Sequence, residues 1–279
     1  MTLALTGSSG FVGSFLKEYF RTKGYKIISV TRDDFNNINS LNEKISQADI
    51  IINLVGANII QRWTDEYKKI LYNSRIDNTK KIVEAINSNN KKQTLLSTSA
   101  VGIYSDNEPN NEEEFKYGNT FLTKICKDWE DEAQKANARV LICRFGVVLG
   151  NGGALKKMLL PFKLGLGGRI GDGKQSFSYI HICDLARAYD YLIQNDMLRG
   201  VFNFCSPHST TNEIYTQVLS HTLNRPAIFP LPVFVLKVAF GEGSTVLTNG
   251  QNVYPKKLLD NGFKFKFEYI EEVMADLLK

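Results

Sequence analysis

The stretch Thr6-Gly7-Ser8-Ser9-Gly10-Phe11-Val12-Gly13 joins an apolar run to an amphipathic one, and it decides the fold. Residues 2–6, just before it, have the composition of a buried strand. After it, apolar residues recur at the spacing of one helix face, at Val12, Phe15, Leu16, Tyr19 and Phe20. Gly24 fits a helix C-terminal cap, and residues 26–32 form a second β-rich run. This order predicts a βαβ unit of about 30 residues.

The same alternation continues along the chain. Further apolar strands are expected near 50–55, 94–99, 139–148 and 201–205, and helices near 64–87, 119–136 and 184–194. Nearly continuous apolar strands that alternate with helices are typical of a parallel sheet covered on both faces. We therefore predict an α/β protein with a Rossmann-type, doubly wound parallel sheet and a smaller C-terminal substrate-side domain.

The pattern changes from about residue 152. A Gly-rich loop covers 164–173, apolar strands near 178–182 and 201–205 return to the sheet, and five of the seven prolines follow residue 206. We predict a dinucleotide-binding domain over 1–155, its sheet completed by about 178–206, and a substrate-side domain over 156–279. In the second domain Thr210-x-x-Glu213 is expected to form a capping box that opens a helix.

Composition excludes several classes of protein. The 279 residues are 43% hydrophobic and 23% charged, unlike a disordered chain. The net charge of +5 is spread along the sequence, so we expect no nucleic-acid partner. No window approaches 18 apolar residues, so we expect no membrane partner. Four widely spaced cysteines, at 126, 143, 183 and 205, predict free thiols, no metal site and a cytoplasmic location.

The quoted glycines predict a pyrophosphate-binding turn. Gly7 permits a tight turn, Gly10 lets backbone approach the anion, and Gly13 allows the helix to pack closely on the strand. The helix that follows presents free N–H groups and the positive end of its dipole. A Gly-x-x-Gly-x-x-Gly pattern is weak evidence alone, but its position between a strand and a helix makes it specific.

The end of the second strand predicts which dinucleotide binds. An acidic side chain at this point typically holds the ribose 2′-hydroxyl of NAD, whereas here Thr31 and Arg32 come first. A guanidinium pairs with a phosphate in bidentate fashion, so Arg32 favours NADP(H) over NAD(H). Asp33 and Asp34 would oppose this preference if their carboxylates pointed inward.

Several motifs resemble, in order and spacing, the extended short-chain dehydrogenase/reductases. They are ThrGlySerSerGlyPheValGly (6–13), AsnLeuValGlyAlaAsnIle (53–59), SerThrSerAlaValGlyIleTyr (97–104), CysArgPheGlyValValLeuGly (143–150) and TyrIleHisIleCysAspLeuAla (179–186). Over essentially its whole length the chain is more closely similar to the atypical "epimerase family" branch, known as nucleoside-diphosphate-sugar epimerase-like and sometimes as cell-division inhibitor-like. The branch is marked by residues 62–64, 121–130 and 160–168 and by the tail from 251.

The resemblance implies roles for individual residues. It makes Gly7, Ser8, Gly10, Phe11, Val12 and Gly13 the pyrophosphate turn, and Thr31 and Arg32 the contact to the 2′-phosphate. It places Leu54, Val55 and Gly56 against the adenine and ribose, and Arg144, Gly146 and Val147 beside the nicotinamide. Ser99, or Thr98 beside it, matches the catalytic Ser/Thr of the superfamily. For Arg144 to Val147, an ordinary buried strand is an equally good explanation.

The sequence departs from the superfamily at its Tyr-x-x-x-Lys pair. The tyrosine is expected at Phe121 or Leu122, and the lysine at Ile125 or Cys126. None of these side chains can donate a proton as the tyrosine does or lower its pKa as the lysine does. Tyr104 and Tyr117 are nearby catalytic alternatives, although both are more simply explained as half-buried loop aromatics.

A second departure concerns the substrate. Nucleotide-sugar enzymes place an arginine four residues before the position of His181, where this chain has Phe177. Without that guanidinium a nucleotide-sugar substrate is not expected, unless Arg169 or Lys174 takes its place. His181 itself is more simply a hydrogen-bonded histidine at a strand end than a catalytic base.

Two functions follow from these observations. The first is an NADP(H)-dependent oxidoreductase or epimerase-like enzyme, in which Ser99 polarises a carbonyl or hydroxyl of a small-molecule substrate. The second is a non-catalytic NADP(H)-dependent sensor or partner-binding protein. The missing Tyr/Lys pair favours the second function, and the retained Ser99 favours the first.

Overall fold

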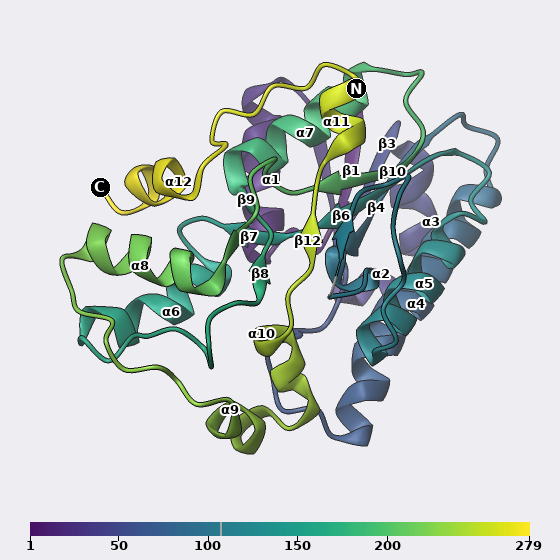
Figure 1. Cartoon of the computed structure of the whole chain (residues 1–279). Helices are drawn as coiled ribbons and strands as arrows, with labels where there is room; N and C mark the ends of the chain where they lie inside the picture. The colour runs from purple at the N-terminus through teal and green to yellow at the C-terminus, as the bar shows by residue number, and fades with distance from the viewer. Residues whose placement is uncertain (107) are drawn as a thin grey trace.

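The computed structural model describes residues 1–106 and 108–279, and a six-stranded parallel sheet lies at its centre (Figure 1). The strand order is β10-β6-β4-β3-β1-β2. These strands are β1 (Thr2–Thr6), β2 (Lys26–Val30), β3 (Ile50–Asn53), β4 (Thr94–Ala100), β6 (Arg139–Phe145) and β10 (Gly200–Phe204). The order reverses direction beside β1, as in a doubly wound sheet, so the predicted Rossmann-type fold is confirmed.

Helices cover both faces of the sheet (Figure 1). On one face lie α1 (Phe11–Thr22) and α7 (Ile182–Gln194), and on the other α3 (Ile38–Gln47), α4 (Asp65–Asn87) and α5 (Phe121–Ala133). Side chains of a strand alternate between faces, so Leu3 and Leu5 pack with α1 whereas Ala4 packs with α3 and α4. The result is one apolar core on each side of the sheet.

Threonine side chains fix where three helices begin. Thr64, Thr120 and Thr211 accept hydrogen bonds from backbone N–H groups at the start of α4, α5 and α8 (Asn212–Leu223). The capping box predicted at Thr210 and Glu213 is therefore wrong, because the N-cap is Thr211 and its hydroxyl accepts from the Ile214 N–H. The reason is that the short strand β11 (Thr210–Thr211) pairs with β8 (Ser176–Phe177), which moves the cap to Thr211. The short helix α2 (Arg32–Asn36) follows β2 directly.

The strand predicted over 139–148 is broken at Gly146. Beyond the break, β7 (Val147–Leu149) leaves the central sheet and pairs in parallel with β9 (Tyr179–His181). A Cβ on Gly146 would lie 2.8 Å from the carbonyl oxygen of Ser178, so this close crossing requires glycine. The prediction that 178–182 returns to the main sheet is therefore wrong, whereas β10 does join it.

The C-terminal part has a separate small core. It contains Leu155, Phe162, Tyr215, Leu219 and Val273. The elements of this part are α6 (Gly153–Lys163), α8, α9 (Val233–Phe240), α10 (Thr245–Thr248), α11 (Lys256–Asp260) and α12 (Ile270–Leu277). The chain then returns to the first part, because β12 (Asn252–Val253) pairs with β5 (Pro109–Asn110). The domain limits at 155 and 156 remain a prediction.

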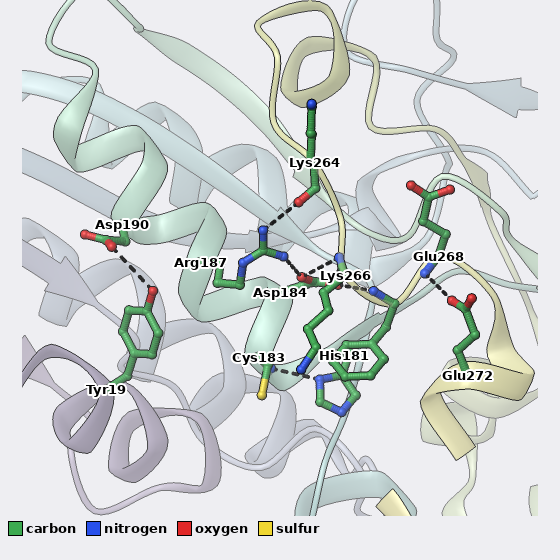
Figure 2. A network of polar contacts seen from close by, with 11 residues as sticks. Tyr19, His181, Cys183, Asp184, Arg187, Asp190, Lys264, Lys266, Glu268 and Glu272 are labelled. Carbon is green, nitrogen blue, oxygen red and sulfur yellow. Dashed lines mark hydrogen bonds and ion pairs between the residues drawn. The ribbon is translucent and has the colours of Figure 1, made fainter. Parts of the chain in front are cut away.

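A polar network attaches the C-terminal tail to α7 (Figure 2). The fully buried Asp184 carboxylate accepts hydrogen bonds from the backbone N–H groups of Lys266 and Phe267, at 3.0 and 2.8 Å. Arg187 pairs with Asp184 and donates to the carbonyl oxygen of Lys264 at 2.8 Å. The tail is thereby fixed beside the end of β9.

Of the helices in the described part of the chain, none is both long and apolar enough to cross a bilayer.

Candidate functional site

The glycine turn between β1 and α1 has the conformation that the sequence predicts. Gly7 has a positive φ of 63°, which only glycine adopts without strain, and its carbonyl accepts a hydrogen bond from the Gly10 N–H at 3.0 Å. A Cβ on Gly13 would lie 2.1 Å from the same carbonyl oxygen. Gly13 therefore allows α1 to pack tightly against the turn.

The first turn of α1 is open to an anion. Gly10 is the N-cap, no side chain caps the first N–H groups, and no acidic residue lies in the first turn. A Cβ on Gly10 would touch only the Gly7 carbonyl oxygen, at 3.3 Å, so space is left beside the backbone. Phe11 packs against Gly152, Ser8 is half-buried, and Val12 packs on the sheet core. The turn therefore fits a pyrophosphate group.

At the end of β2 one carboxylate is turned away from this space. Asp34 is buried and accepts hydrogen bonds from Lys44 at 2.7 Å, Ser40 at 2.6 Å and the Thr31 backbone at 2.7 Å. Burial alone would raise the pKa of Asp34, but these hydrogen bonds outweigh it and hold the pKa well below its usual range. Arg32 is exposed at the start of α2. The charge of Asp34 is thus balanced by Lys44 and does not oppose an anion beside Arg32.

We expect Asp34→Asn to destabilise the protein by about 1–3 kcal/mol at pH 7, because charge-assisted hydrogen bonds are lost. The low folded-state pKa makes this contribution fully present above the ordinary pKa of about 3.9, and it is lost as the pH falls below that value. Urea unfolding of both proteins at pH 7 and pH 3 measures the difference. Asp33→Asn, at an exposed neighbour, is the control. A deficit of equal size at both pH values would contradict the role of the Asp34 charge.

The loop after β3 lies against the glycine turn. The Leu54 N–H donates to the Thr6 hydroxyl at 2.9 Å, and a Cβ on Gly7 would lie 3.1 Å from the Leu54 carbonyl oxygen. Gly56 faces the Arg75 guanidinium, whose Nη2 donates to the Ala57 carbonyl at 3.0 Å. The carboxyl ends of β1, β2 and β3 therefore bring most of the predicted cofactor residues, including Val55, to one edge of the sheet.

An apolar cleft adjoins this edge. Its main part has a volume of about 260 Å³ and is lined by side chains that follow β4 and β6 and by the segment 245–251. A second part of about 120 Å³ extends toward α6 and β8 and shares Ile60, Val101, Val147 and Val246 with the first. These two adjoining parts together make up the cleft between the Rossmann sheet and the C-terminal elements.

Ser99 does not face this cleft. Its side chain is 1% exposed, and its hydroxyl donates to Glu130 on α5 at 2.6 Å. Because side chains alternate along β4, Thr98 points to the opposite face, 3.3 Å from the Tyr189 hydroxyl, and Ala100 lines the cleft. The prediction that Ser99 or Thr98 contacts a substrate is therefore not supported by the geometry.

Arg144 is likewise directed into the interior. Its guanidinium donates to Glu130 at 2.8 and 2.6 Å and to the Tyr104 hydroxyl at 2.7 Å. The Tyr104 hydroxyl in turn donates to Asn203 at 2.8 Å, and burial raises the pKa of Tyr104 to about 12 although Arg144 acts in the opposite sense. These contacts favour the alternative of an ordinary buried strand for Arg144, whose place beside the nicotinamide stays a prediction, whereas Phe145, Gly146 and Val147 line the cleft.

Tyr117 lies outside the cleft. It is 48% exposed, with the Lys127 ammonium 4.5 Å from its ring centre, and it borders a different hollow that also contains Glu112 and Arg144. Of the two predicted catalytic tyrosines, Tyr104 therefore lies in the interior, and Tyr117 lies on the surface beside that other hollow.

The residues at the expected Tyr-x-x-x-Lys positions are apolar in the structure as well. Leu122 lines the cleft, and Phe121 packs against Trp63 with ring centres 5.7 Å apart. Ile125 and Cys126 are buried, and burial raises the pKa of the Cys126 thiol to about 11. Of these four side chains only the Cys126 thiol carries a titratable proton, and it is buried away from the cleft.

His181 has a structural position. It is the N-cap of α7, where its Nδ1 accepts a hydrogen bond from the Cys183 N–H at 3.1 Å (Figure 2). Its ring packs on Phe267 with centres 4.0 Å apart, and burial lowers its pKa although Asp276 acts in the opposite sense. His181 does not line the cleft, so it remains best explained as a hydrogen-bonded histidine at a strand end.

The predicted replacements for a phosphate-binding arginine are also elsewhere. Arg169 is exposed and pairs with Glu213 at 2.6 Å, whereas Phe177 forms part of the cleft wall. Across residues 1–106 and 108–279, no cluster of three or more His, Cys, Asp or Glu side chains is arranged to hold a metal ion.

Comparison with known protein families agrees with this architecture. The family model described as "NAD dependent epimerase/dehydratase family" matches residues 3–205, which include the glycine turn and all six strands of the central sheet. The chain belongs to this family. A second model, a domain of unknown function named DUF1731, matches residues 231–277. The predicted resemblance to epimerase-family proteins is thereby confirmed.

Relatives of this epimerase-family chain extend over its whole length. It is 33% identical to epimerase family protein SDR39U1 of Mus musculus, covering 100% of both chains. It is 34% identical to the chloroplastic SDR39U1 homolog of Arabidopsis thaliana, covering 100% of this chain and 87% of that protein. The crystal structure of human epimerase family protein SDR39U1 (isoform 2) with NADPH has a TM-score of 0.90 and 29% identity, covering 100% of this chain and 99% of the other.

Sequence reasoning missed part of the cleft in this epimerase-family protein. Ile60, Thr120, Val246 and Asn249 come from three separate segments and belong to none of the quoted motifs. The other side of the cleft carried a signal, since the motifs at 97–104 and 143–150 and the tail that opens at Gln251 all supply lining residues.

Proposed function

We propose that this chain binds NADPH at the carboxyl edge of its sheet. The observation that carries the proposal is the open glycine turn at Gly7 to Gly13 beside Arg32, with the Asp34 carboxylate turned toward Lys44. The turn and the N–H groups of α1 would hold the pyrophosphate, and Arg32 the 2′-phosphate. The human relative, whose structure was solved with NADPH, supports the same assignment.

The activity that this site supports best is an NADPH-dependent oxidoreductase acting on a small molecule. Bound NADPH supplies a hydride, and Leu54 to Gly56 and Gly146 to Val147 would orient its two ends. The adjoining cleft offers this substrate a mainly apolar wall. Phe177 in the cleft wall removes the cation that a nucleotide sugar would need for its diphosphate, so the substrate belongs to another class.

Arg32→Ala is expected to weaken NADPH binding by about tenfold or more and to leave NADH binding nearly unchanged, because only NADPH loses a charge-assisted contact. Isothermal titration calorimetry with both dinucleotides measures this. Arg21→Ala, at an exposed arginine in the last turn of α1, is the matched control. Equal affinities of the unmodified chain for NADPH and NADH would overturn the assignment of Arg32.

A non-catalytic NADPH-dependent sensor is the second candidate, and one observation favours it. Ser99 and Tyr104 are buried away from the cleft, and no described cleft residue is a tyrosine, histidine, lysine or acid. Oxidation of NADPH with a panel of carbonyl compounds separates the two functions. Turnover supports the oxidoreductase, whereas binding of NADPH without turnover of any compound supports the sensor.

The cysteines bear on where the protein acts. Cys126, Cys143 and Cys205 are buried free thiols. We propose a reducing compartment, the cytoplasm, in which such thiols persist. We also propose that neither nucleic acid nor a membrane is a partner, since the positive charges are dispersed along the sequence.

A further inference from the structure

We infer that the cleft takes a neutral, largely apolar carbonyl compound. The inference rests on the proposed function, since the carbonyl is the group that NADPH reduces. In that step the carbonyl carbon gains a hydride, its oxygen gains a proton from solvent water, and an alcohol and NADP⁺ are formed.

The cleft has no charged wall. Its two parts share the apolar side chains of Ile60, Val101, Val147 and Val246, and Phe145 and Phe177 extend them. Among the described residues that line it, none is Asp, Glu, His, Lys or Arg. The neighbouring hollow, by contrast, contains Glu112, Lys127, Asp131 and Arg144. The absence of charge is therefore a property of this cleft and not of the whole surface.

Several polar side chains of the cleft already donate hydrogen bonds within the protein. The amide groups of Asn249 and Gln251 both donate to the Asp106 carboxylate, outside the cleft wall. The Ser178 hydroxyl donates to the Gln251 carbonyl at 2.7 Å, and the Thr245 hydroxyl to the Glu242 carbonyl at 2.8 Å. These donors hold the segment 245–251 in place.

The Gln175 amide follows the same pattern. It donates to the carbonyl oxygens of Ile170 and Leu247, at 3.3 and 3.5 Å. A sugar that entered the cleft would lose hydrogen bonds to water and find these donors occupied, which costs free energy for every unpaired hydroxyl. A phosphate or carboxylate would lose more, because no described wall residue supplies a cation. Apolar contact is therefore the main interaction that the cleft offers a ligand.

A matched pair of probes tests this inference. The neutral ketone 2-acetylnaphthalene and its anionic analogue 6-acetyl-2-naphthoate differ by one carboxylate, and UDP-glucose represents the nucleotide sugars. Calorimetric titration of the full chain, with and without NADPH, is expected to show at least about tenfold tighter binding of the ketone than of the carboxylate. UDP-glucose is expected not to bind. A carboxylate or UDP-glucose affinity equal to that of the ketone, or no binding of the ketone, overturns the inference.

A charge placed at the cleft edge is expected to reverse the preference. Val246 is half-buried on the short helix α10, so a lysine there can direct its ammonium into the cleft mouth. Val246→Lys should weaken the ketone by about tenfold and strengthen the carboxylate by a similar factor. Val246→Leu is the control and should change neither. If both variants fold, judged by circular dichroism, and keep the original preference, the ligand binds elsewhere and the inference fails.

The outcome is separable from the proposed function. NADPH affinity is measured in an independent titration, so a chain that binds the ketone but no NADPH supports the cleft chemistry and refutes the oxidoreductase. A chain that binds NADPH but prefers the carboxylate refutes the cleft chemistry and leaves the proposed NADPH-dependent function standing.

Discussion

Gly10→Val is expected to abolish measurable NADPH binding while the protein stays folded. The N-cap glycine leaves the backbone open beside the first N–H groups of α1, where the pyrophosphate would lie. A branched side chain would fill that space and exclude the anion from those N–H groups. The fold should tolerate the change, because a Cβ on Gly10 meets only the Gly7 carbonyl oxygen, at 3.3 Å, and φ at this residue is −75°.

The measurement is calorimetric titration with NADPH, together with circular dichroism and thermal unfolding. Glu18→Val introduces the same side chain at an exposed position of the same helix and should leave NADPH binding intact. Gly13→Val is a useful contrast: its Cβ would lie 2.1 Å from a backbone oxygen, so we expect it to unfold the turn as well. A folded Gly10→Val protein with normal NADPH affinity would show that the dinucleotide binds elsewhere.

Glu130→Ala is expected to destabilise the protein by about 3–5 kcal/mol, because it leaves the buried Arg144 guanidinium without its counter-charge. Glu130 accepts hydrogen bonds from Ser99 at 2.6 Å and from Arg144 at 2.8 and 2.6 Å, and all three residues are almost fully buried. Together with Ser99, the buried pair thus links β4, α5 and β6. Urea unfolding at pH 7 measures the loss.

Lys124→Ala is the matched control on the same helix. Lys124 pairs with Asp128 at the surface, where such an ion pair contributes about 0.5 kcal/mol or less. The NADPH affinity of the Glu130→Ala protein, measured at a temperature where it remains folded, should equal that of the unmodified chain. The reason is that the Glu130–Arg144 pair does not face the cleft. A loss below about 1 kcal/mol for Glu130→Ala would contradict the role of the buried pair, and a specific loss of NADPH affinity would give Glu130 a role in the site.

The sequence by itself determined the local features of this protein. Residues 2–30 specify a strand, a glycine turn, a helix and a second strand, because each choice depends on near neighbours. Gly7 is required by its positive φ, and Gly13 by its close contact with the Gly7 carbonyl oxygen, six residues earlier in the chain. The family, the parallel sheet and the edge that gathers the cofactor turn follow from this local order.

Only the tertiary structure decided which side chains reach the cleft. A shift of one residue along β4 exchanges the two faces of the sheet, so Ser99 meets Glu130 in the interior while Ala100 lines the cleft. The motif at 97–104 does not specify which of its side chains face the cleft. This depends on where α5 packs, more than 20 residues further along the chain.

The far wall of the cleft was beyond the sequence for the same reason. The segment 245–251 reaches the sheet because the Asn249 and Gln251 amides bind Asp106 and because β12 pairs with β5, contacts that join residues more than 140 apart. No local spacing encodes such contacts, since they form only when the whole chain has packed. The sequence therefore determined the glycine turn, and the tertiary structure determined the apolar, uncharged cleft.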